Sequence, residues 1–544
     1  MIHCDDKQKK MQRRPDFAHP QNVVANTVST RDLSCCYDTS RVQQNPAVYV
    51  SSQTGDDAAN GGRTASSPVA TFEKAIDVLN RIAAWGGEAV VHLMDTVAIT
   101  GNSSESTPAG VEILRPKIGQ ARAVKVTGHE PTHTTFRIVD GTSLTPTPPA
   151  GLSTWPAYPW VTVSSTMVAG THARKRFTIT HPTTGAIAAD GVVCTNTITG
   201  FHLIMDYGVD YTGYDLHLID PVTGATPPRL DLTASATGDV YYLDGDVPLV
   251  FSGIDLRTDY ARFASHDPCY SVTFERVQWE IGDNSPPVNG ERFVLRASYV
   301  FATTSGTRQS FVDGPCDRFD IERCWMHDTR IAIGPSTPYG WMDGSPIRFE
   351  IHTTVFDGVA NCNLAGYGRV VNTAFLNGYG TTPTDQITGN VFYWNSGMSG
   401  TNVASAAMGF AAAARATMVN CELVDSSGGT SPVLDINNST VHFVGPMLIL
   451  TAQTGGAASN YLINMAGGAS LSALDVSLTF AIDANVAATA ELAINGGSVA
   501  SIGSSAATFG AGPTQIDWID GGGPAAFPVI AGWQQNGSCR VATY

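Results

Sequence analysis

A short pair of positions, an apolar residue followed by asparagine, recurs along the last two-fifths of the chain. The first members of successive pairs lie about 17 to 31 residues apart, and the shortest spacing is about 17 to 20 residues. A second apolar residue often follows four positions after the first. The pairs are Val371-Asn372, Gly389-Asn390 (with glycine as the weak member), Val419-Asn420, Ile436-Asn437, Ile463-Asn464 and Ile494-Asn495, with earlier variants at Ile321-Glu322 and Ile351-His352.

A period near 20 residues in strand-forming sequence predicts a solenoid, because one coil cannot bury its own apolar side and must stack on the next. Strands in neighbouring coils then lie about 4.8 Å apart, with equivalent residues in columns. Asparagine is expected at the bend, where it tolerates left-handed backbone and can bond to the next coil as an asparagine ladder. The apolar residues expected to face the interior are Ile321 and Trp325, Ile351 and Val355, Val371 and Phe375, and Val419 and Leu423.

The stretch from Val48 to Leu79 runs from an apolar strand through a turn rich in glycine, aspartate and asparagine into an amphipathic helix. Thr71 is a suitable N-cap for this helix. The helix would cover the open end of the strand coils and protect their edge. Its apolar stripe consists of Phe72, Ile76, Leu79 and Ala83.

This stretch resembles the entry motif of the pectate-lyase-like right-handed parallel β-helix superfamily. In that motif a strand, a glycine- and aspartate-rich turn, a Ser-Pro-x-x-Thr segment (here Ser67 to Thr71) and a capping helix precede the coils. The superfamily includes polysaccharide lyases, glycoside hydrolases, epimerases and bacteriophage tailspikes. The resemblance implies a mainly β fold, a right-handed single-stranded parallel β-helix with an N-terminal capping helix and loop or domain insertions. No catalytic motif of the superfamily is matched residue by residue, so the resemblance concerns the fold and not an activity.

Composition divides the chain into five predicted segments. The first is polar and has few apolar anchors, which is typical of a segment that does not fold alone. The third contains either an inserted β domain or long loops between coils. The segments are an extended polar N-terminal arm (1–45), the β-helix entry with its capping helix (46–143), an irregular or inserted β region (144–270), the parallel β-helix (271–505) and a C-terminal cap or assembly tail (506–544).

The chain has 544 residues and a net charge of −16, from 32 Lys and Arg against 48 Asp and Glu. This acidic field argues against nucleic acid and anionic membrane surfaces as partners of the body. No run of 18 apolar residues could cross a bilayer, so membrane insertion is not expected. The start lacks the apolar run of a signal peptide, and the 10 cysteines show no zinc or disulfide spacing. We therefore expect synthesis in the cytoplasm, free thiols, and release by a leaderless route.

Basic residues near the N-terminus give the arm a charge opposite to that of the body. An arm of this composition becomes ordered most easily by lying on another polypeptide. We therefore expect self-association, as a homotrimer, and docking on other particle proteins through the arm. The basic residues are Lys7, Lys9, Lys10, Arg13 and Arg14.

Two neighbouring repeats carry matching carboxylates. If their phenylalanines and isoleucines face inward, Asp320 and Glu350 face outward in one column. Adjacent coils would place the two carboxylates about 5 Å apart, which suits a retaining glycosidase, so they are the candidate catalytic pair. The alternative is a surface ion ladder in which Arg318 and Arg348 form ion pairs with the two carboxylates. The repeats are RFDI at 318–321 and RFEI at 348–351.

The insertion between these repeats, residues 334–345, is the candidate substrate-binding loop. Tyr339 and Trp341 offer flat faces for sugar rings, and Asp343 offers a hydrogen-bond acceptor. His352 and Asp357 lie on the same two repeats and complete the candidate binding set.

No metal-ligand spacing or cofactor motif occurs, so we predict no resident cofactor. A calcium ion could bind at Asp56, Asp57 and Asn60 near the entry, although turn chemistry alone explains these residues.

Three functions are compatible with these features. The first is a virion-associated, tailspike- or fibre-like structural protein of a phage or phage-like particle that contacts bacterial surface polysaccharide. The second is a polysaccharide-degrading enzyme, a glycoside hydrolase or lyase, that uses Asp320 and Glu350. The third is a purely structural particle component without a ligand.

Overall fold

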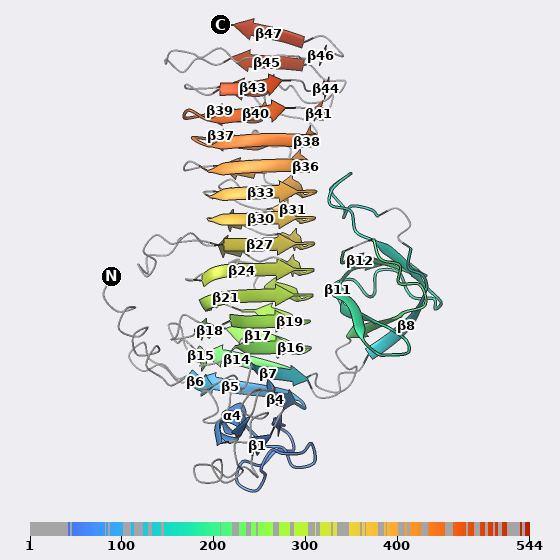
Figure 1. Ribbon diagram of the computed structural model, residues 1–544, viewed down its shortest axis with the longest axis vertical. Coiled ribbons are helices and arrows are strands. Elements are labelled where there is room, and N and C mark those ends of the chain that lie inside the picture. The colour runs from blue at the N-terminus through green and yellow to red at the C-terminus, as the bar shows by residue number, and fades with distance from the viewer. Residues whose placement is uncertain are drawn as a thin grey trace, which may run out of the picture.

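The chain forms an elongated stack of parallel β-coils with a small β-barrel beside it (Figure 1). The computed structural model describes residues 42–43, 46–81, 83–84, 88–101, 110–113, 123–128, 133–142, 146–206, 208–219, 228–234, 241–245, 248–259, 261–264, 271–282, 288–302, 310–311, 316–327, 330–333, 348–358, 362–364, 366–378, 386–387, 389–400, 408–410, 414–425, 433–451, 461–474, 477–482, 490–494, 499–503, 506–509, 514–518, 534–535 and 539–543.

Equivalent strands of successive coils pair in parallel and form three faces, here called face 1, face 2 and face 3. Face 1 contains β2 (Ala47–Val50), β4 (Glu88–Leu93), β7 (Ala123–Gly128), β16 (Leu249–Ser252), β19 (Ser271–Glu275), β21 (Val288–Arg296), β24 (Cys316–Glu322), β27 (Arg348–His352), β30 (Tyr367–Val371), β33 (Asn390–Trp394), the first parts of β36 (Arg415–Asp425) and β38 (Thr440–Thr451), β40 (Ser470–Leu474) and β43 (Val499–Gly503).

Face 2 contains β5 (Thr96–Gly101), β14 (Arg229–Ala234), β17 (Asp255–Asp259), β20 (Gln278–Ile281), β22 (Tyr299–Ala302), β25 (Trp325–His327), β28 (Val355–Asp357), β31 (Ala374–Gly378), β34 (Gly397–Gly400), the second parts of β36 and β38, β41 (Ser477–Ile482), β44 (Ala506–Phe509) and β46 (Gln534–Gln535). Face 3 contains β6 (Gly110–Ile113), β15 (Tyr241–Gly245), β18 (Ala261–Ala264), the first part of β21, β23 (Ser310–Phe311), β26 (Arg330–Ile333), β29 (Cys362–Leu364), β32 (Gln386–Ile387), β35 (Met408–Phe410), β37 (Leu434–Asn437), β39 (Tyr461–Ala466), β42 (Ala490–Ile494), β45 (Thr514–Trp518) and β47 (Cys539–Thr543).

These pairings confirm the predicted mainly β, parallel β-helix fold. Among the described residues α4 (Phe72–Arg81) is the one helix, and no helix there is long and apolar enough to span a bilayer. A short parallel pair, β1 (Val42–Gln43) with β3 (Ala83–Ala84), lies beside the helix at the entry.

Two inward columns of face 1 contribute large side chains to the interior of the stack. One column contains Phe293, Phe319 and Phe349 and then Gly368, where a Cβ atom would lie 2.2 Å from the Phe349 ring. Glycine is therefore required there, because the phenylalanine of the coil below takes up its space. Each large side chain buried in this way stabilises the fold by about 1.5–3 kcal/mol. The other column consists of Phe274, Leu295, Ile321, Ile351, Val370, Tyr393, Met418 and Phe443.

Face 1 ends at a corner where, in seven successive coils from β19 to β36, one residue has left-handed backbone. The amide of this residue donates to a carbonyl of the next coil, as from Asn372 N to Trp394 O at 2.9 Å. In six successive coils the following side chain is Ser, Thr or Cys and donates to the carbonyl two residues before it. The left-handed residues are Arg276, Ala297, Arg323, Thr353, Asn372, Asn395 and Asn420, and the donors are Ser298, Cys324, Thr354, Thr373, Ser396 and Cys421.

The asparagines of this corner differ from those that the sequence pattern picks out. Asn372 and Asn420 occupy it together with Asn395, and Asn420 Nδ2 donates to Asn395 Oδ1 at 3.1 Å. Asn390 instead lies at the start of β33, in register with Tyr367. On face 3, Asn437 is in register with Ala466, and Asn464 is in register with Asp435. The two N-terminal variants of the pair, at Ile321 and Ile351, are shifted by one residue relative to Val371-Asn372. Both isoleucines are in register with Val370 rather than with Val371.

The corner also changes which apolar residues face the interior. Ile321, Ile351, Phe375 and Leu423 belong to the interior core, as predicted. The prediction is wrong for Trp325 and Val355, which point outward from face 2 and are buried against the barrel. It is also wrong for Val371 and Val419, which lie on the outer side of face 1 and are half-buried. The left-handed residue at the bend interrupts the alternation of inward and outward side chains. Two residues four positions apart on either side of the bend therefore need not both face the interior.

At the entry, α4 packs on β2 and β5 with Phe72, Ile76 and Leu79 buried. Its N-cap is Thr71, whose Oγ1 accepts the amide of Lys74 at 3.2 Å. Ala83 lies beyond the helix in β3, so it is not part of the helical stripe.

The acidic residues of the entry turn are occupied by local hydrogen bonds. Asp57 accepts the amide of Ala70 at 2.7 Å and the hydroxyl of Thr71 at 2.7 Å. Asp56 accepts two backbone amides, and these bonds lower the pKa of its carboxyl. Within the described part of the chain, no group of three or more metal-ligating side chains is positioned to hold an ion.

Between β7 and β14 the chain leaves the stack and forms a closed antiparallel barrel with its own apolar core. An inserted β domain therefore accounts for this region. It begins at His133 and ends at Ile219, and the coils resume at Arg229, so its bounds differ from the predicted 144–270. The barrel order is β10 (Arg176–Thr180), β11 (Ile187–Asn196), β12 (Gly200–Ile204), β9 (Trp160–Val163), β8 (His133–Asp140) and β13 (Asp215–Ile219).

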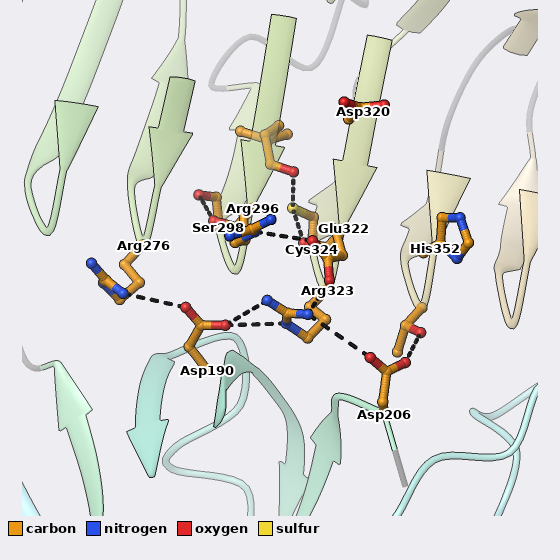
Figure 2. Close-up of polar contacts among 12 residues, drawn as sticks. Asp190, Asp206, Arg276, Arg296, Ser298, Asp320, Glu322, Arg323, Cys324 and His352 are labelled. Atoms are coloured by element: carbon orange, nitrogen blue, oxygen red, sulfur yellow. Dashed lines mark hydrogen bonds and ion pairs between the residues drawn. The ribbon is translucent and has the colours of Figure 1, made fainter. Parts of the chain in front are cut away.

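The barrel is fixed to the corner by buried ion pairs (Figure 2). Asp190 of β11 accepts Arg276 Nη1 at 3.3 Å and Arg323 Nη2 at 2.8 Å, and both arginines are left-handed corner residues. Asp206, which follows β12, accepts the hydroxyl of Thr353 at 2.7 Å. The corner thus presents side chains outward to the barrel while its backbone continues the stack.

Apolar contacts and one buried carboxylate extend the docking surface along face 2. Tyr158 is buried with Trp325 and Val355, and its hydroxyl donates to Asn372 O at 3.0 Å. Further along the stack, Glu422 is fully buried and accepts four hydrogen bonds from the loop at residues 153–155. The barrel and the loop between its strands β8 and β9 therefore cover face 2 over several coils.

Alkaline pH is expected to destabilise the corner through its two buried thiols. Burial raises the pKa of both Cys324 and Cys421 from 9.0 to about 12, so native thiols stay protonated where unfolded ones ionise. Stability is then complete below pH 9 and falls as the pH rises towards 12, by about 1.4 kcal/mol per pH unit for each thiol. Thermal unfolding between pH 8 and 11 measures this decline. The double variant Cys324→Ser and Cys421→Ser keeps both donors and should decline less steeply; an equal slope would contradict the assignment.

Candidate functional site

The outer side of face 1 holds the predicted carboxylate pair. Asp320 on β24 and Glu350 on β27 are in register on adjacent coils, as the sequence suggests. His352 lies two residues beyond Glu350 on the same strand, and its Nε2 lies 3.1 Å from Glu350 Oε2. These three residues are therefore brought together.

The remaining predicted residues do not join this group. Asp357 is on β28 of face 2, where it lies 3.3 Å from His327 and 3.7 Å from Arg174 of the barrel. It belongs to the barrel docking surface. Tyr339, Trp341 and Asp343 lie outside the described residues.

Asp320 is held by two arginines. Arg292 Nε donates to Oδ2 at 2.6 Å and Arg318 Nε donates to Oδ1 at 2.8 Å, and the Asp320 carboxylate is buried. The hydrogen bond to Asp320 raises the pKa of the Arg318 guanidinium. Both carboxylate oxygens are thus engaged, which is the arrangement of an ion ladder that runs from β21 to β24.

Above Asp320, face 1 is hollowed into an open groove with a volume of about 620 Å³. Strands β24 to β38 contribute alternate outward residues to it, two from most strands. The groove therefore runs across successive coils, along the axis of the stack. Its outward-facing lining consists of Arg318, Arg348, Glu350, Tyr367, Arg369, Asn390, Phe392, Arg415, Thr417 and His442.

Exposed aromatic and apolar residues accompany the groove. Tyr367 lines it and is 50% exposed. Trp394, 47% exposed, lies edge-on to Phe392 with ring centroids 6.4 Å apart. In register above Trp394, Val444 is also exposed. A flat, partly apolar rim beside arginines can stack on a sugar ring while the guanidiniums bond to its substituents.

The sequence interpretation missed Arg369, Arg415, Tyr367 and Trp394. Each occupies an outward position of a strand that alternates inward and outward residues, such as YGRVV at 367–371 and NVFYW at 390–394. This alternation was visible in the sequence. It could not be assigned to a face until the corner residues fixed the register between strands.

Comparison with known proteins identifies similar shapes but no family. No protein-family model matches the chain, and no curated protein matches it. The chain is similar to the tailspike protein gp49 from Pseudomonas phage LKA1, with 14% identity, a TM-score of 0.24, and coverage of 86% of this chain and 79% of that chain. It is also similar to the tailspike gp61 of Pseudomonas phage phi297, with 11% identity, a TM-score of 0.30, and coverage of 85% and 81%. The fold assignment rests on the strand pairing described above.

Proposed function

We propose that the protein is a tailspike- or fibre-like component of a phage or phage-like particle and that face 1 of its β-helix contacts host-surface glycans. The observation that carries this proposal is the groove, whose lining combines arginines with the rings of Tyr367 and Phe392 on a stack of paired strands, with the exposed ring of Trp394 beside Phe392. Side chains held on paired strands keep their spacing when a ligand arrives, which favours recognition of an extended chain.

Attachment and assembly complete the proposal. The polar arm at residues 1–45, with its basic start, would dock on another particle protein. A homotrimer would have to form through surfaces other than the part of face 2 that the barrel covers. A mass measurement of the purified protein in solution tests this, and a stable monomer at micromolar concentration would remove the trimer from the proposal.

Removing the exposed rings is expected to weaken glycan binding. The double variant Tyr367→Ala and Trp394→Ala should lower affinity for the recognised polysaccharide about tenfold or more, because stacked aromatic contacts are lost. Binding to a panel of purified bacterial surface polysaccharides, and adsorption to the corresponding cells, measures this. Val168→Ala, an exposed apolar truncation on the barrel, is the control. If no polysaccharide of the panel binds the folded wild-type protein, the purely structural alternative is favoured.

The second candidate function is hydrolysis or elimination at Asp320 and Glu350. Their adjacent positions in register and the contact between Glu350 and His352 favour it. The two arginines on Asp320 favour the ion ladder instead. Reducing-sugar release and the absorbance of unsaturated products on the same panel distinguish the two. Turnover that is abolished by Glu350→Gln while binding persists would establish the enzyme.

A further inference from the structure

Three arginines of the groove differ from the other arginines of face 1 in having no carboxylate partner among the described residues. Arg292, Arg296 and Arg318 each form an ion pair with Asp320 or Glu322. Arg348, Arg369 and Arg415 are exposed, and no carboxylate among the described residues lies within 4.0 Å of them. The arginines of β21 and β24 are therefore paired with carboxylates, whereas the arginines without such a partner among the described residues begin at β27.

The register places the three guanidiniums along the stack. Arg348, Tyr367, Asn390 and Arg415 occupy one outward column on four successive coils. Arg348 and Arg415 are thus three strand spacings apart, or about 14 Å. Arg369 lies in the neighbouring outward column, in register with Glu350. Positive charge is therefore spread along the groove rather than gathered at one point.

The groove has little negative charge of its own to satisfy these arginines. Glu350 is its single acidic lining residue among the described ones, and it is shared by His352 at 3.1 Å and Arg318 at 4.0 Å. The chain as a whole has a net charge of −16, so a positive groove is a local exception on an acidic protein. Guanidinium groups bind carboxylate and phosphate through paired, charge-assisted hydrogen bonds.

We infer that the groove binds an extended anionic glycan that lies along the stack from β27 to β36. Its carboxylate or phosphate groups are held by Arg348, Arg369 and Arg415, and its sugar rings lie against Tyr367 and Trp394. This inference rests on the proposed function and specifies the ligand as a polyanion. The ion ladder below sets one end of the site, because its arginines are already paired with Asp320 and Glu322 and are not available to an anionic ligand.

The test uses full-length protein and calorimetry with four probes. Three are a polymannuronate oligosaccharide, the same oligosaccharide after its carboxyl groups are reduced to alcohols, and a poly(glycerol phosphate). The fourth is duplex DNA, which carries phosphates without the sugar spacing of a glycan. Binding of the polyuronate or the poly(glycerol phosphate), with affinity that falls as salt rises, is expected, and the stronger of the two identifies the anionic group.

The triple variant Arg348→Ala, Arg369→Ala and Arg415→Ala is expected to lose at least a hundredfold in affinity for the anionic probe, with about tenfold lost for each single change. Arg348→Lys should retain part of the affinity because the charge remains. Arg63→Ala, an exposed arginine at the entry turn, removes the same charge far from the groove and should change nothing. Circular dichroism confirms that each variant is folded.

Several results would overturn the inference. They are equal affinity for the reduced and the charged oligosaccharide, unchanged binding by the folded triple variant, binding of DNA alone, and binding of no probe. If the neutral oligosaccharide binds and Trp394→Ala abolishes this, the anionic ligand is rejected while glycan contact by face 1 stands. If no glycan of either charge binds, on the probes or on the polysaccharide panel, both the inference and the proposed function fall.

Discussion

Asp190→Ala is expected to loosen the barrel from the β-helix and to lower the stability of the docked state by about 3 kcal/mol. Asp190 is buried, and it accepts Arg276 Nη1 at 3.3 Å and Arg323 Nε at 3.1 Å (Figure 2). Removing one partner of a buried ion pair costs about 3–5 kcal/mol, because the other charge stays desolvated without its counter-ion. Arg323 keeps Glu322 as a second partner, so the lower end of this range applies.

Hydrogen exchange and denaturant unfolding measure this effect. Exchange should accelerate in residues 187–196, and the barrel should unfold before the stack, as a separate transition. Asp215→Ala is the matched control on the same barrel, because its pair with Arg137 at 3.0 Å is partly exposed to solvent. A surface pair of this kind contributes about 0–1 kcal/mol. Equal losses in the two variants would show that Asp190 is not an anchor.

The repeat and the stacked architecture could be predicted from the sequence, because burying one apolar interior requires apolar residues at regular positions. A stack with one apolar interior needs inward residues at a regular period, and Ile321, Ile351, Phe375 and Leu423 satisfy it. The capping helix was equally visible, since Thr71 and the stripe Phe72, Ile76 and Leu79 follow local rules of helix formation.

The phase of the repeat was harder to predict, because an apolar residue before asparagine occurs on both sides of a strand. Val371 faces outward, although it precedes the corner residue Asn372, whereas Val370 faces inward. The more reliable signal is the residue after the left-handed position, which is Ser, Thr or Cys in six coils. Its hydroxyl or thiol satisfies a backbone carbonyl at the bend, which an apolar side chain cannot do.

The outward residues that form the groove and the docking surface could not be predicted in this way. Trp325 fits the interior rule by its spacing, yet it is buried by the barrel, whose position depends on contacts far apart in the sequence. The sequence offers Arg348 as a partner for the two carboxylates, but Arg318 and Arg292 take that role for Asp320. Which arginine stays unpaired depends on the register of three coils, and this register is a tertiary property.

Glu422→Ala is expected to release the loop at residues 153–155 from face 2 and to lower stability by about 3–5 kcal/mol. Glu422 is fully buried, and its carboxylate accepts the amides of Ser153 at 2.8 Å, Thr154 at 2.7 Å and Trp155 at 3.2 Å. Alanine would leave these three amides without an acceptor. Each buried donor left unpaired costs about 1–3 kcal/mol, which water entering the site would partly offset.

Ser153→Ala provides the graded control. It removes one hydroxyl donor, which lies 2.8 Å from Glu422 Oε1, but keeps the three amide bonds, so a loss of only about 1 kcal/mol is expected. Chemical denaturation and protease cleavage within residues 151–156 measure both variants. Similar behaviour of the two would show that Tyr158 and its apolar neighbours, rather than the carboxylate, hold the loop.

Combining Glu422→Ala with Asp190→Ala tests whether the barrel docks as one body. Asp190 contacts the corner beside β19 and β24, whereas Glu422 lies further along the stack on β36. Changes at distant, independent sites add within about 0.5 kcal/mol. If either single substitution already detaches the barrel, the other contact no longer contributes to stability. The double variant should then lose clearly less stability than the sum of the two single losses. Full additivity would instead mean that the barrel and its loop are attached to face 2 independently.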